Sequence, residues 1–420
     1  MGTKRRGVFA AGLVAGAMVL VSCASAPSAK SGSSTSTTGS AGATTTSAPA
    51  PVPARYQSEY ALVAAQTRSF GALSRAGARR PQAATTMGTE LLTANGNIGA
   101  GLLQADAIDR VDAELDAFTA LGVSGVTVDV SFPLLLPSTP DSTGYLAFYE
   151  QVARAVRAHH MVLSVEENPI FSGTPLTSLP ISYRGLTPAG FAAEQHAQAQ
   201  LIVDDLEPAY LTILDEPDTF SDTVGVDIDS PSGAVAFVNG VLDGLQRGTT
   251  LLGAGTGNWE GPSIDQALVA QTTIDYLDVH VYLFGPAALS NLTSEVSVAR
   301  VADKPLVMDE TWLNKPTPTQ GNGPAGAPDE LKLKSYSFWE PLDEQYVGSM
   351  VRYARAQGFR YVSFFDGARA FFAYLPWSPT LEAATYAQFT VQYNQLVAAN
   401  MSSGTVSGTG QVFRGAVRTG

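Results

Sequence analysis

The sequence predicts an α/β fold, a (β/α)8 TIM barrel formed by a single domain. Strand-like and helix-like segments alternate from residue 85 to about residue 400. Their number matches the eight strand–helix units of this barrel. The helices between the strands favour right-handed crossovers and a parallel sheet. The alternative, an open doubly wound sheet, is disfavoured because no glycine-rich phosphate loop follows the first strand.

The first half of the barrel shows its periodicity in short segments. Apolar residues recur at intervals of three and four from Ile108 to Phe118, which predicts a helix. Thr187 is a candidate N-cap, with Pro188 in the first helical position. The predicted strands cover residues 86–92, 123–130, 161–165 and 210–214, and the predicted helices cover residues 106–121, 144–159 and 187–205.

The second half repeats the same alternation. A long loop rich in proline and glycine, over residues 311–338, separates the seventh strand from the helix that follows it. The predicted strands cover residues 250–254, 276–283, 305–308 and 359–365, and the predicted helices cover residues 232–245, 263–271, 287–301, 340–357 and 381–398.

The N-terminal residues have the organisation of an exported lipoprotein. A basic stretch at residues 4–6 precedes an apolar run over residues 8–21, which is too short to span a membrane comfortably. Cys23, the single cysteine, follows a stretch that resembles the bacterial lipobox. We therefore predict a signal peptide over residues 1–22, lipid attachment at Cys23, and an extracytoplasmic protein anchored to the membrane. The alternative is a plain secretory signal with a chance cysteine.

Composition divides the rest of the chain. Residues 23–54 are mostly Ser, Thr, Ala, Gly and Pro, which predicts a disordered tether. Residues 55–84 predict a helical segment that packs on the barrel, residues 85–400 form the barrel, and residues 401–420 predict a flexible tail. The abundance of alanine and glycine is typical of a bacterium with a GC-rich genome, such as an actinobacterium.

Charge and cysteine content exclude several functions. The formal net charge of −13 repels phosphate backbones, so nucleic acid is disfavoured as a partner, whereas a neutral ligand such as a sugar is compatible. One cysteine allows no intrachain disulfide and no cysteine-based metal centre. His, Asp and Glu residues do not show metal-ligand spacing, so we predict no metal and no other cofactor. We expect a monomer.

Polar and aromatic residues gather at the C-terminal ends of the predicted strands, where active sites of (β/α)8 enzymes lie. A purely structural barrel has no need of carboxylates there, since burial of an unpaired charge costs several kcal/mol. The candidate residues are Glu90, Asp129, Glu166, Asp215, Glu216, Asn258, Trp259, His280, Tyr282, Glu310, Trp312 and Asp366. The alternative for Glu216 and Glu310 is that each caps a following helix.

Three motifs in this order resemble the retaining glycoside hydrolases of clan A. Asp215-Glu216-Pro217 ends the fourth strand, His280-Val281-Tyr282 lies on the sixth, and Met308-Asp309-Glu310 ends the seventh. The resemblance implies that Glu216 is the acid/base and Glu310 the nucleophile. It also implies that Tyr282 donates a hydrogen bond to Glu310, while His280 contacts the substrate or the surroundings of Glu216.

The chain departs from that family at several positions. Asp215 stands where the family usually has an asparagine that contacts the sugar 2-hydroxyl, Asp129 occurs where an arginine is often seen, and Phe365-Asp366 replaces a common tryptophan. Trp312 is the best candidate for stacking on a sugar face. The predicted substrate contacts are Asp215, Trp312, Glu90, Asp129, Glu166, Asn258, Trp259 and Asp366.

The sequence thus predicts a retaining glycoside hydrolase. Its substrate would be a polysaccharide or oligosaccharide of the cell envelope or the environment, cleaved by double displacement. A transglycosylase would use the same residues and differ only in the acceptor. The alternative from another class is a catalytically silent lipoprotein that binds carbohydrate or organises the envelope, because a fold alone does not give a function.

Overall fold

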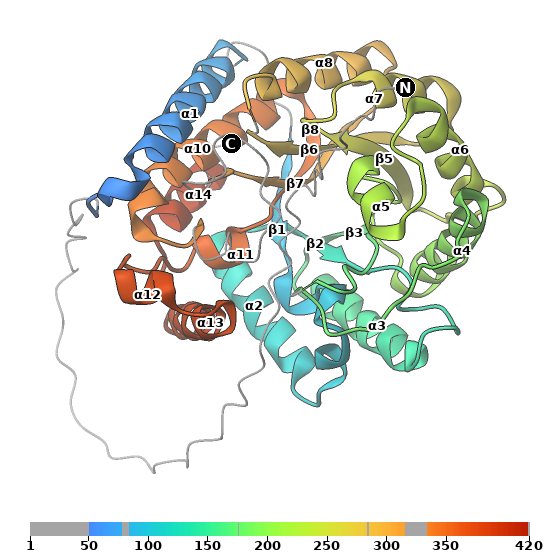
Figure 1. Ribbon diagram of the computed structural model, residues 1–420, viewed down its shortest axis with the longest axis horizontal. Helices are drawn as coiled ribbons and strands as arrows, with labels where there is room; N and C mark the ends of the chain where they lie inside the picture. Colours follow the sequence, from blue (N-terminus) through green and yellow to red (C-terminus); the bar gives the residue numbers. More distant parts are fainter. Residues whose placement is uncertain (1–49, 78–83, 175, 284, 316–333, 419–420) are drawn as a thin grey trace, which may run out of the picture.

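A closed parallel barrel of eight strands, in the order β1 to β8, forms the centre of the molecule and confirms the predicted fold (Figure 1). The computed structural model describes residues 50–77, 84–174, 176–283, 285–315 and 334–418. The strands are β1 (Thr86–Glu90), β2 (Gly125–Asp129), β3 (Val162–Glu166), β4 (Tyr210–Thr212), β5 (Leu251–Gly257), β6 (Tyr276–Tyr282), β7 (Leu306–Trp312) and β8 (Phe359–Phe364).

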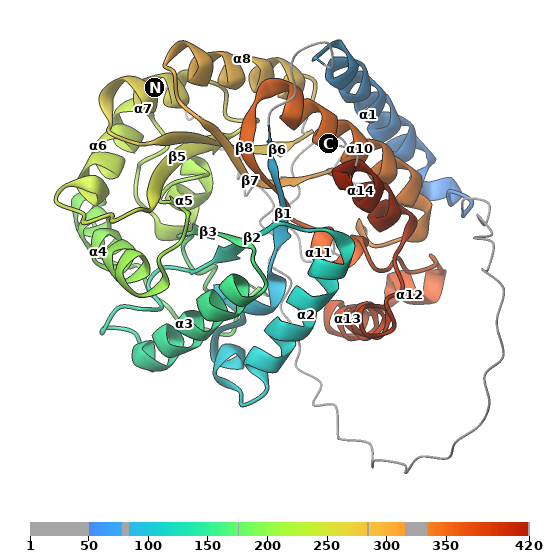
Figure 2. The same cartoon turned by 180° about the vertical axis from the view of Figure 1, so that it is seen from behind.

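Helices surround the strands as an outer ring in both views (Figures 1 and 2). In the first half, α2 (Ala107–Leu121) follows β1, α3 (Ser142–Ala158) follows β2, α4 (Pro188–Leu201) follows β3, and both α5 (Pro217–Val224) and α6 (Pro231–Leu242) follow β4. In the second half, α7 (Ser263–Gln271) follows β5, α8 (Ala288–Val301) follows β6 and α10 (Glu340–Gln357) follows β7. The chain adds α11 (Gly367–Ala370), α12 (Pro379–Ala383), α13 (Tyr386–Ser403) and α14 (Gly408–Arg418).

Local sequence signals fix several helix ends. The Thr187 hydroxyl accepts a hydrogen bond from the Gly190 amide and Pro188 opens α4, as predicted. The predicted helix over residues 381–398 is instead two helices. The break comes at Ala384, because Thr385 and Gln388 form a capping box that starts α13.

Large aromatic rings fill the interior of the barrel. A side chain at Gly253 would place its Cβ atom 1.9 Å from the Tyr276 ring, so this strand position requires glycine. The Tyr276 and Tyr361 rings both contact Tyr210, with ring centroids 5.5 and 5.8 Å apart. These rings close the barrel beneath the C-terminal ends of the strands.

The N-terminal segment forms one long helix, α1 (Gln57–Gly77), preceded by a short 3-10 turn. It lies alongside α10 in both views (Figures 1 and 2). Phe70 of α1 is fully buried and its ring lies 5.5 Å from the rings of both Tyr346 and Tyr353 of α10. This segment therefore packs against the helical ring of the barrel.

The expectation of a flexible C-terminal tail is wrong for the residues that the structure describes. Residues 408–418 form α14, and Phe413 is fully buried. Its ring stacks on Phe371 at a centroid distance of 4.5 Å and meets Phe364 edge-on at 5.6 Å. The glycine and serine content suggested disorder, but one aromatic anchor supplies the burial that holds the helix in place.

Other expectations lie outside the described residues. They concern the signal peptide, Cys23, the tether up to residue 49 and most of the loop over residues 311–338. Within the described part of the chain, no helix combines the length and the apolar character that a membrane span requires.

The packing of α14 predicts a measurable loss of stability. Phe413→Ala should lower the free energy of unfolding by about 3–5 kcal/mol, because a buried aromatic ring is lost and a cavity remains. Gln411→Ala, at an exposed position of the same helix, should stay within about 0.5 kcal/mol of the wild type. Urea unfolding followed by circular dichroism measures both, and equal midpoints for the two variants would contradict the packing role of α14.

Candidate active site

Glu216 lies where β4 turns into α5. The chain is buried from Leu211 to Leu214, beyond the end of the strand, and Pro217 then occupies the first position of α5. Glu216 is the residue before that helix, yet its side chain makes no capping hydrogen bond. Its Oε2 instead accepts a hydrogen bond from the Thr219 hydroxyl at 2.7 Å. This geometry weighs against the alternative that Glu216 serves to cap the helix.

A bulge in β7 brings two consecutive acidic residues to the inside of the barrel. From Val307 to Thr311 the strand advances four residues, while the paired stretch of β6, Asp278 to Val281, advances three. The same extra residue appears against β8. Neighbouring residues of a regular strand point to opposite faces, but a bulge turns one of them back. Asp309 and Glu310 are consequently both buried inside.

Tyr282 and His280 lie on the same face of β6, two residues apart. The Tyr282 hydroxyl donates a hydrogen bond to Glu310 Oε1. His280 Nδ1 lies 3.0 Å from Glu216 Oε1 and 3.3 Å from Glu310 Oε2. His280 Nδ1 therefore lies between Glu216 and Glu310, the two glutamates that the sequence predicts as a catalytic pair.

The other nitrogen of His280 faces a second group of carboxylates. Nε2 lies 3.1 Å from Glu166 Oε1 and 3.2 Å from Asp278 Oδ2. Asp215 Oδ2 is farther away, at 3.8 Å. Both ring nitrogens are thus next to carboxylate oxygens, an arrangement that suits a doubly protonated imidazole.

Charge explains the protonation state of this histidine. Burial alone lowers the pKa of His280, but Asp278 and Glu166 outweigh that effect and hold the pKa well above its ordinary value. The imidazolium in turn acts to lower the pKa of Asp215 and Glu310. His280 is therefore a fixed cation between two sets of acids.

Burial and mutual repulsion raise the pKa of the surrounding carboxyls. Burial is the largest cause for Glu310, and Glu216 and Asp215 add to it, so its pKa rises to about 8 despite His280 and Tyr282. Burial is also the main cause for the other raised carboxyls. The pKa is about 8 for Asp129 and Asp309, about 7 for Asp215, and well above its ordinary value for Glu90 and Glu166.

Sequence patterns did not identify the polar layer beneath the pair. Asp309 accepts hydrogen bonds from the hydroxyls of Ser164 and Thr212, and its amide donates to Asp278 Oδ1 at 3.0 Å. Asp278 lies two residues before His280, so both side chains point to the same face of β6. This alternation along the strand could have identified Asp278 as a neighbour of His280 from the sequence. These residues hold the bulge of β7 and the imidazole of His280 in place.

Glu90 and Asp129 come from β1 and β2 and differ in their partners. Asp129 accepts hydrogen bonds from Ser131 at 2.9 Å and Asn97 at 3.3 Å. Glu90 is buried and its Oε2 accepts no hydrogen bond within the described structure. The Glu310 charge helps to raise the Glu90 pKa, after burial, which places Glu90 near the catalytic pair.

Asn258 and Trp312, two of the predicted substrate contacts, make contacts within the protein. The Asn258 side chain donates to the Ala288 carbonyl at 3.1 Å and accepts from the Tyr282 amide at 3.0 Å. Trp312 is fully buried and meets Phe371 edge-on at a centroid distance of 6.0 Å. Asn258 therefore fixes the backbone of Tyr282, and Trp312 packs against an aromatic neighbour while its role as a substrate contact stays a prediction.

Trp259 and Asp366 are both linked to the surroundings of Tyr282. The Trp259 indole nitrogen donates to Asp218 Oδ2 at 3.0 Å, and its ring lies 6.0 Å from the Tyr282 ring. Asp366 pairs with Lys334, whose Nζ lies 3.6 Å from Asp366 Oδ2 and 6.0 Å from the centre of the Tyr282 ring. The sequence analysis did not single out Lys334, because it lies far from any strand end.

The tertiary structure also assembles groups that could hold a cation. One potential donor atom from each member lies within 4.8 Å of the others in two sets, Glu166–Asp215–His280 and Glu216–His280–Glu310. Spacing along the chain gave no indication of these sets, because their members come from different strands. The second set contains both glutamates of the proposed pair, so a metal ion there would compete with their use in catalysis.

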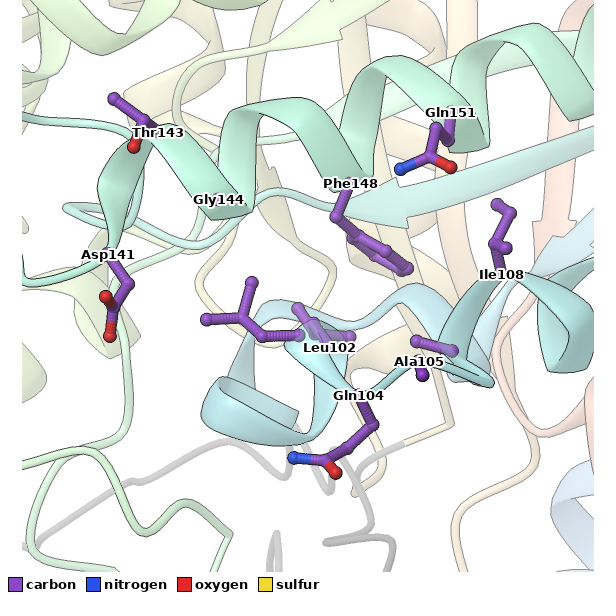
Figure 3. Close-up of a pocket in the computed structure, with 11 residues that line it drawn as sticks. Leu102, Gln104, Ala105, Ile108, Asp141, Thr143, Gly144, Phe148 and Gln151 are labelled. Carbon is purple, nitrogen blue, oxygen red and sulfur yellow. The ribbon is translucent and has the colours of Figure 1, made fainter.

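Two surface hollows lie elsewhere. One, of about 450 Å³, lies between the 3-10 segment η3 (Gly96–Leu103) and α3, with Phe148 above Leu102 (Figure 3). The other is a shallow groove between α7 and α8. Neither contains a predicted site residue. By contrast, Glu216 and Glu310 are 1% and 0% exposed.

No protein-family model matches the chain, and no curated protein matches its sequence. Solved structures match its fold. GH5_18 from Bifidobacterium longum subsp. infantis gives a TM-score of 0.53 at 13% identity, over 80% of this chain and 79% of that one. GH5_18 from Bifidobacterium longum subsp. longum gives 0.52 at 15% identity, over 80% and 79%. A variant of the latter has been solved in complex with Manb1-4GlcNAc.

A third solved structure is the exo-beta-1,4-mannosidase Op5Man5 from Opitutaceae bacterium strain TAV5. Its TM-score is 0.51 at 15% identity, over 80% of this chain but 59% of the mannosidase. At such identities the likeness is one of fold. The chain therefore shares its barrel fold with these proteins, and a shared fold does not by itself give an activity.

The raised carboxyl pKa values predict how stability depends on pH. Between about pH 5 and 8 the folded protein holds protons that the unfolded chain releases, so the free energy of unfolding should fall as pH rises. We expect a loss of roughly 2 kcal/mol or more over that range, at about 1.4 kcal/mol for each pKa unit. Urea unfolding at several pH values measures it.

Two variants provide controls for this dependence. Glu310→Gln removes one of the carboxyls with a raised pKa, so its slope against pH should be shallower. Asp112→Asn changes an exposed carboxyl and should keep the wild-type slope. A free energy of unfolding that increases from pH 5 to pH 8 would contradict the buried, protonated cluster.

Proposed function

We propose that this protein is a retaining glycoside hydrolase that cleaves a polysaccharide or oligosaccharide of the cell envelope or the environment. The observation that carries the proposal is the meeting of Glu216 and Glu310 at His280 Nδ1, at 3.0 and 3.3 Å, with the Tyr282 hydroxyl on the second oxygen of Glu310. Two carboxyl groups on opposite sides of a barrel mouth are the groups that glycosidic cleavage needs.

The separation of the two glutamates supports retention of configuration. One oxygen of Glu216 and one of Glu310 lie within 4.8 Å of each other. Inverting enzymes need about 6.5–9.5 Å between the carboxyl groups, because a water molecule must fit between the base and the sugar. The shorter gap suits a carboxylate that attacks the sugar itself, at the separation of about 5–5.5 Å typical of retaining enzymes.

Each group then has a defined role in double displacement. In the first step Glu310 forms a bond to the anomeric carbon while the glycosidic C–O bond breaks and Glu216 gives its proton to the departing oxygen. In the second step Glu216 takes a proton from water, whose oxygen displaces Glu310. Tyr282 orients Glu310 and stabilises its charge, and the His280 cation faces both glutamates.

The catalytic roles predict different responses to substitution. Glu310→Gln should lower kcat at least about 1,000-fold on every substrate, because the nucleophile is lost. Glu216→Gln should cost about 100- to 10,000-fold on glycosides with poor leaving groups. It should cost much less on dinitrophenyl glycosides, whose leaving group departs without a proton. The assay is hydrolysis of a panel of aryl glycosides with neutral, N-acetylated and amine-bearing sugars.

Three further measurements complete this experiment. Glu114→Gln changes a buried glutamate that bonds Thr93 outside the site and should keep activity within about threefold. Proton NMR should show that the first product keeps the anomeric configuration of the substrate, and an activated fluoro-glycoside should label Glu310. Absence of turnover and label, with glycan affinity unchanged in Glu310→Ala, would favour a silent binding protein.

We also propose that Cys23 carries a lipid that anchors the protein to the outer side of the cell membrane, on the strength of the signal-like sequence before it. Cys23→Ser should move the protein from the detergent phase to the aqueous phase in Triton X-114 partition and abolish incorporation of labelled fatty acid. Ser28→Ala should behave like the wild type. Labelling that persists in Cys23→Ser would place the anchor elsewhere.

A further inference from the structure

We propose that the sugar cleaved at this site carries a free amine, so that the substrate is a glycoside of a non-acetylated amino sugar. The inference rests on the proposed glycosidase function and narrows it to one class of substrate. It is carried by two independent features of the site. One is an excess of acidic groups around a single basic side chain, and the other is a set of buried carboxyl oxygens that accept no hydrogen bond.

The ionisable groups at the site are strongly one-sided. Acidic residues from β1, β2, β3, β6, β7 and the turn after β4 converge on the barrel mouth and on the polar layer beneath it. They are Glu90, Asp129, Glu166, Asp215, Glu216, Asp278, Asp309 and Glu310, and all are buried. Among the residues that the structure describes, His280 is the only basic side chain within 4 Å of any of them.

Hydrogen bonding leaves specific acceptors open. Glu90 Oε2, Asp215 Oδ2 and Glu310 Oε2 are buried and accept no hydrogen bond within the described structure. Each such group costs about 1–3 kcal/mol while it lacks a donor. An ammonium group offers three donors and a positive charge, so it satisfies both needs at once. A hydroxyl offers one donor and no charge.

Asp215 is best placed to recognise the amine. Its Oδ1 accepts a hydrogen bond from the Glu216 amide at 2.7 Å, which fixes the side chain, while Oδ2 accepts no hydrogen bond and lies 3.8 Å from His280 Nε2. Asp215 directly precedes Glu216, and its charge acts on Glu310, whose pKa it helps to raise after burial and Glu216. An amine bound at Asp215 would therefore lie on the sugar whose anomeric carbon reacts.

Other occupants fit these observations less well. A uronic acid would add negative charge to a buried acidic site, which opposes binding. A metal ion held by Glu216, His280 and Glu310 would occupy both catalytic carboxylates. A cationic sugar supplies positive charge only when substrate is bound, and leaves the pair available for reaction.

The test compares matched aryl glycosides that differ in one substituent. The probes are 4-nitrophenyl β-glycosides and α-glycosides of glucosamine and galactosamine, their N-acetyl forms, and the corresponding glucosides and galactosides. The wild type should show a kcat/KM at least about tenfold higher for an amine than for its hydroxyl or N-acetyl counterpart, the value of one charged hydrogen bond. Uronides should be the poorest substrates.

Variants assign that preference to a residue. Asp215→Asn should lower the ratio of kcat/KM for amine over hydroxyl by at least about tenfold, because its amide carries no charge. Asp265→Asn is the matched control. Asp265 is a buried carboxyl that bonds Thr256 and does not face His280, so the ratio should stay as in the wild type. Circular dichroism checks that both variants fold.

Binding gives a readout that is separate from turnover. Calorimetric titration of Glu310→Gln with glucosamine and galactosamine should show binding of one of them, while glucose, galactose and their N-acetyl forms bind at least about tenfold more weakly. Addition of Asp215→Asn to that variant should remove the difference. Mn²⁺ and Zn²⁺ are titrated in parallel, since tight metal binding that His280→Ala abolishes would overturn the inference.

The outcomes separate this inference from the function on which it rests. Hydrolysis of neutral glycosides with no gain from an amine overturns the inference and leaves the glycosidase proposal standing. A preference for amines that survives Asp215→Asn also overturns the assignment to Asp215. If no glycoside of any class is hydrolysed and no fluoro-glycoside labels Glu310, the proposed function fails, whatever the binding data show.

Discussion

The contact between His280 and the carboxylates around it is the interaction on which this site depends. Nδ1 meets Glu216 and Glu310, and Nε2 meets Glu166 and Asp278. That cation favours the ionised forms of Asp215 and Glu310, whereas burial and mutual repulsion favour their neutral forms. The imidazolium therefore joins the two glutamates and links them to the polar layer below.

The barrel supplies the geometry for this arrangement in two ways. Parallel strands bring residues from distant parts of the chain to one end of the sheet, and the bulge in β7 turns Asp309 and Glu310 inward together. Asp309 then serves the interior through Ser164 and Thr212, while Glu310 faces the site. The extra residue in β7 thus lets Asp309 bond to the interior of the barrel while its neighbour Glu310 bonds to Tyr282.

Fold and charge carry different information about function. The barrel is shared with GH5_18 proteins at 13–15% identity, a level at which fold does not fix an activity. Glu216 and Glu310 at the mouth support glycosidic cleavage. The excess of acidic over basic side chains around them supports an amine-bearing sugar. Asp215, which the family resemblance marked as a departure, gains a physical role because its Oδ2 accepts no hydrogen bond in a site where His280 is the single basic group among many acids.

Local patterns were sufficient for the repeat of strands and helices, the caps at Thr187, and the acidic strand ends at Glu216 and Glu310, because periodicity and capping act over a few residues. They could not reveal the helix at residues 408–418, which depends on the contact of Phe413 with Phe371. Nor could they show that Trp312 is buried, that Asn258 supports Tyr282, or that Asp278 holds His280. Those roles depend on which strands become neighbours when the barrel closes, and on the bulge in β7, which no residue type in the sequence predicts.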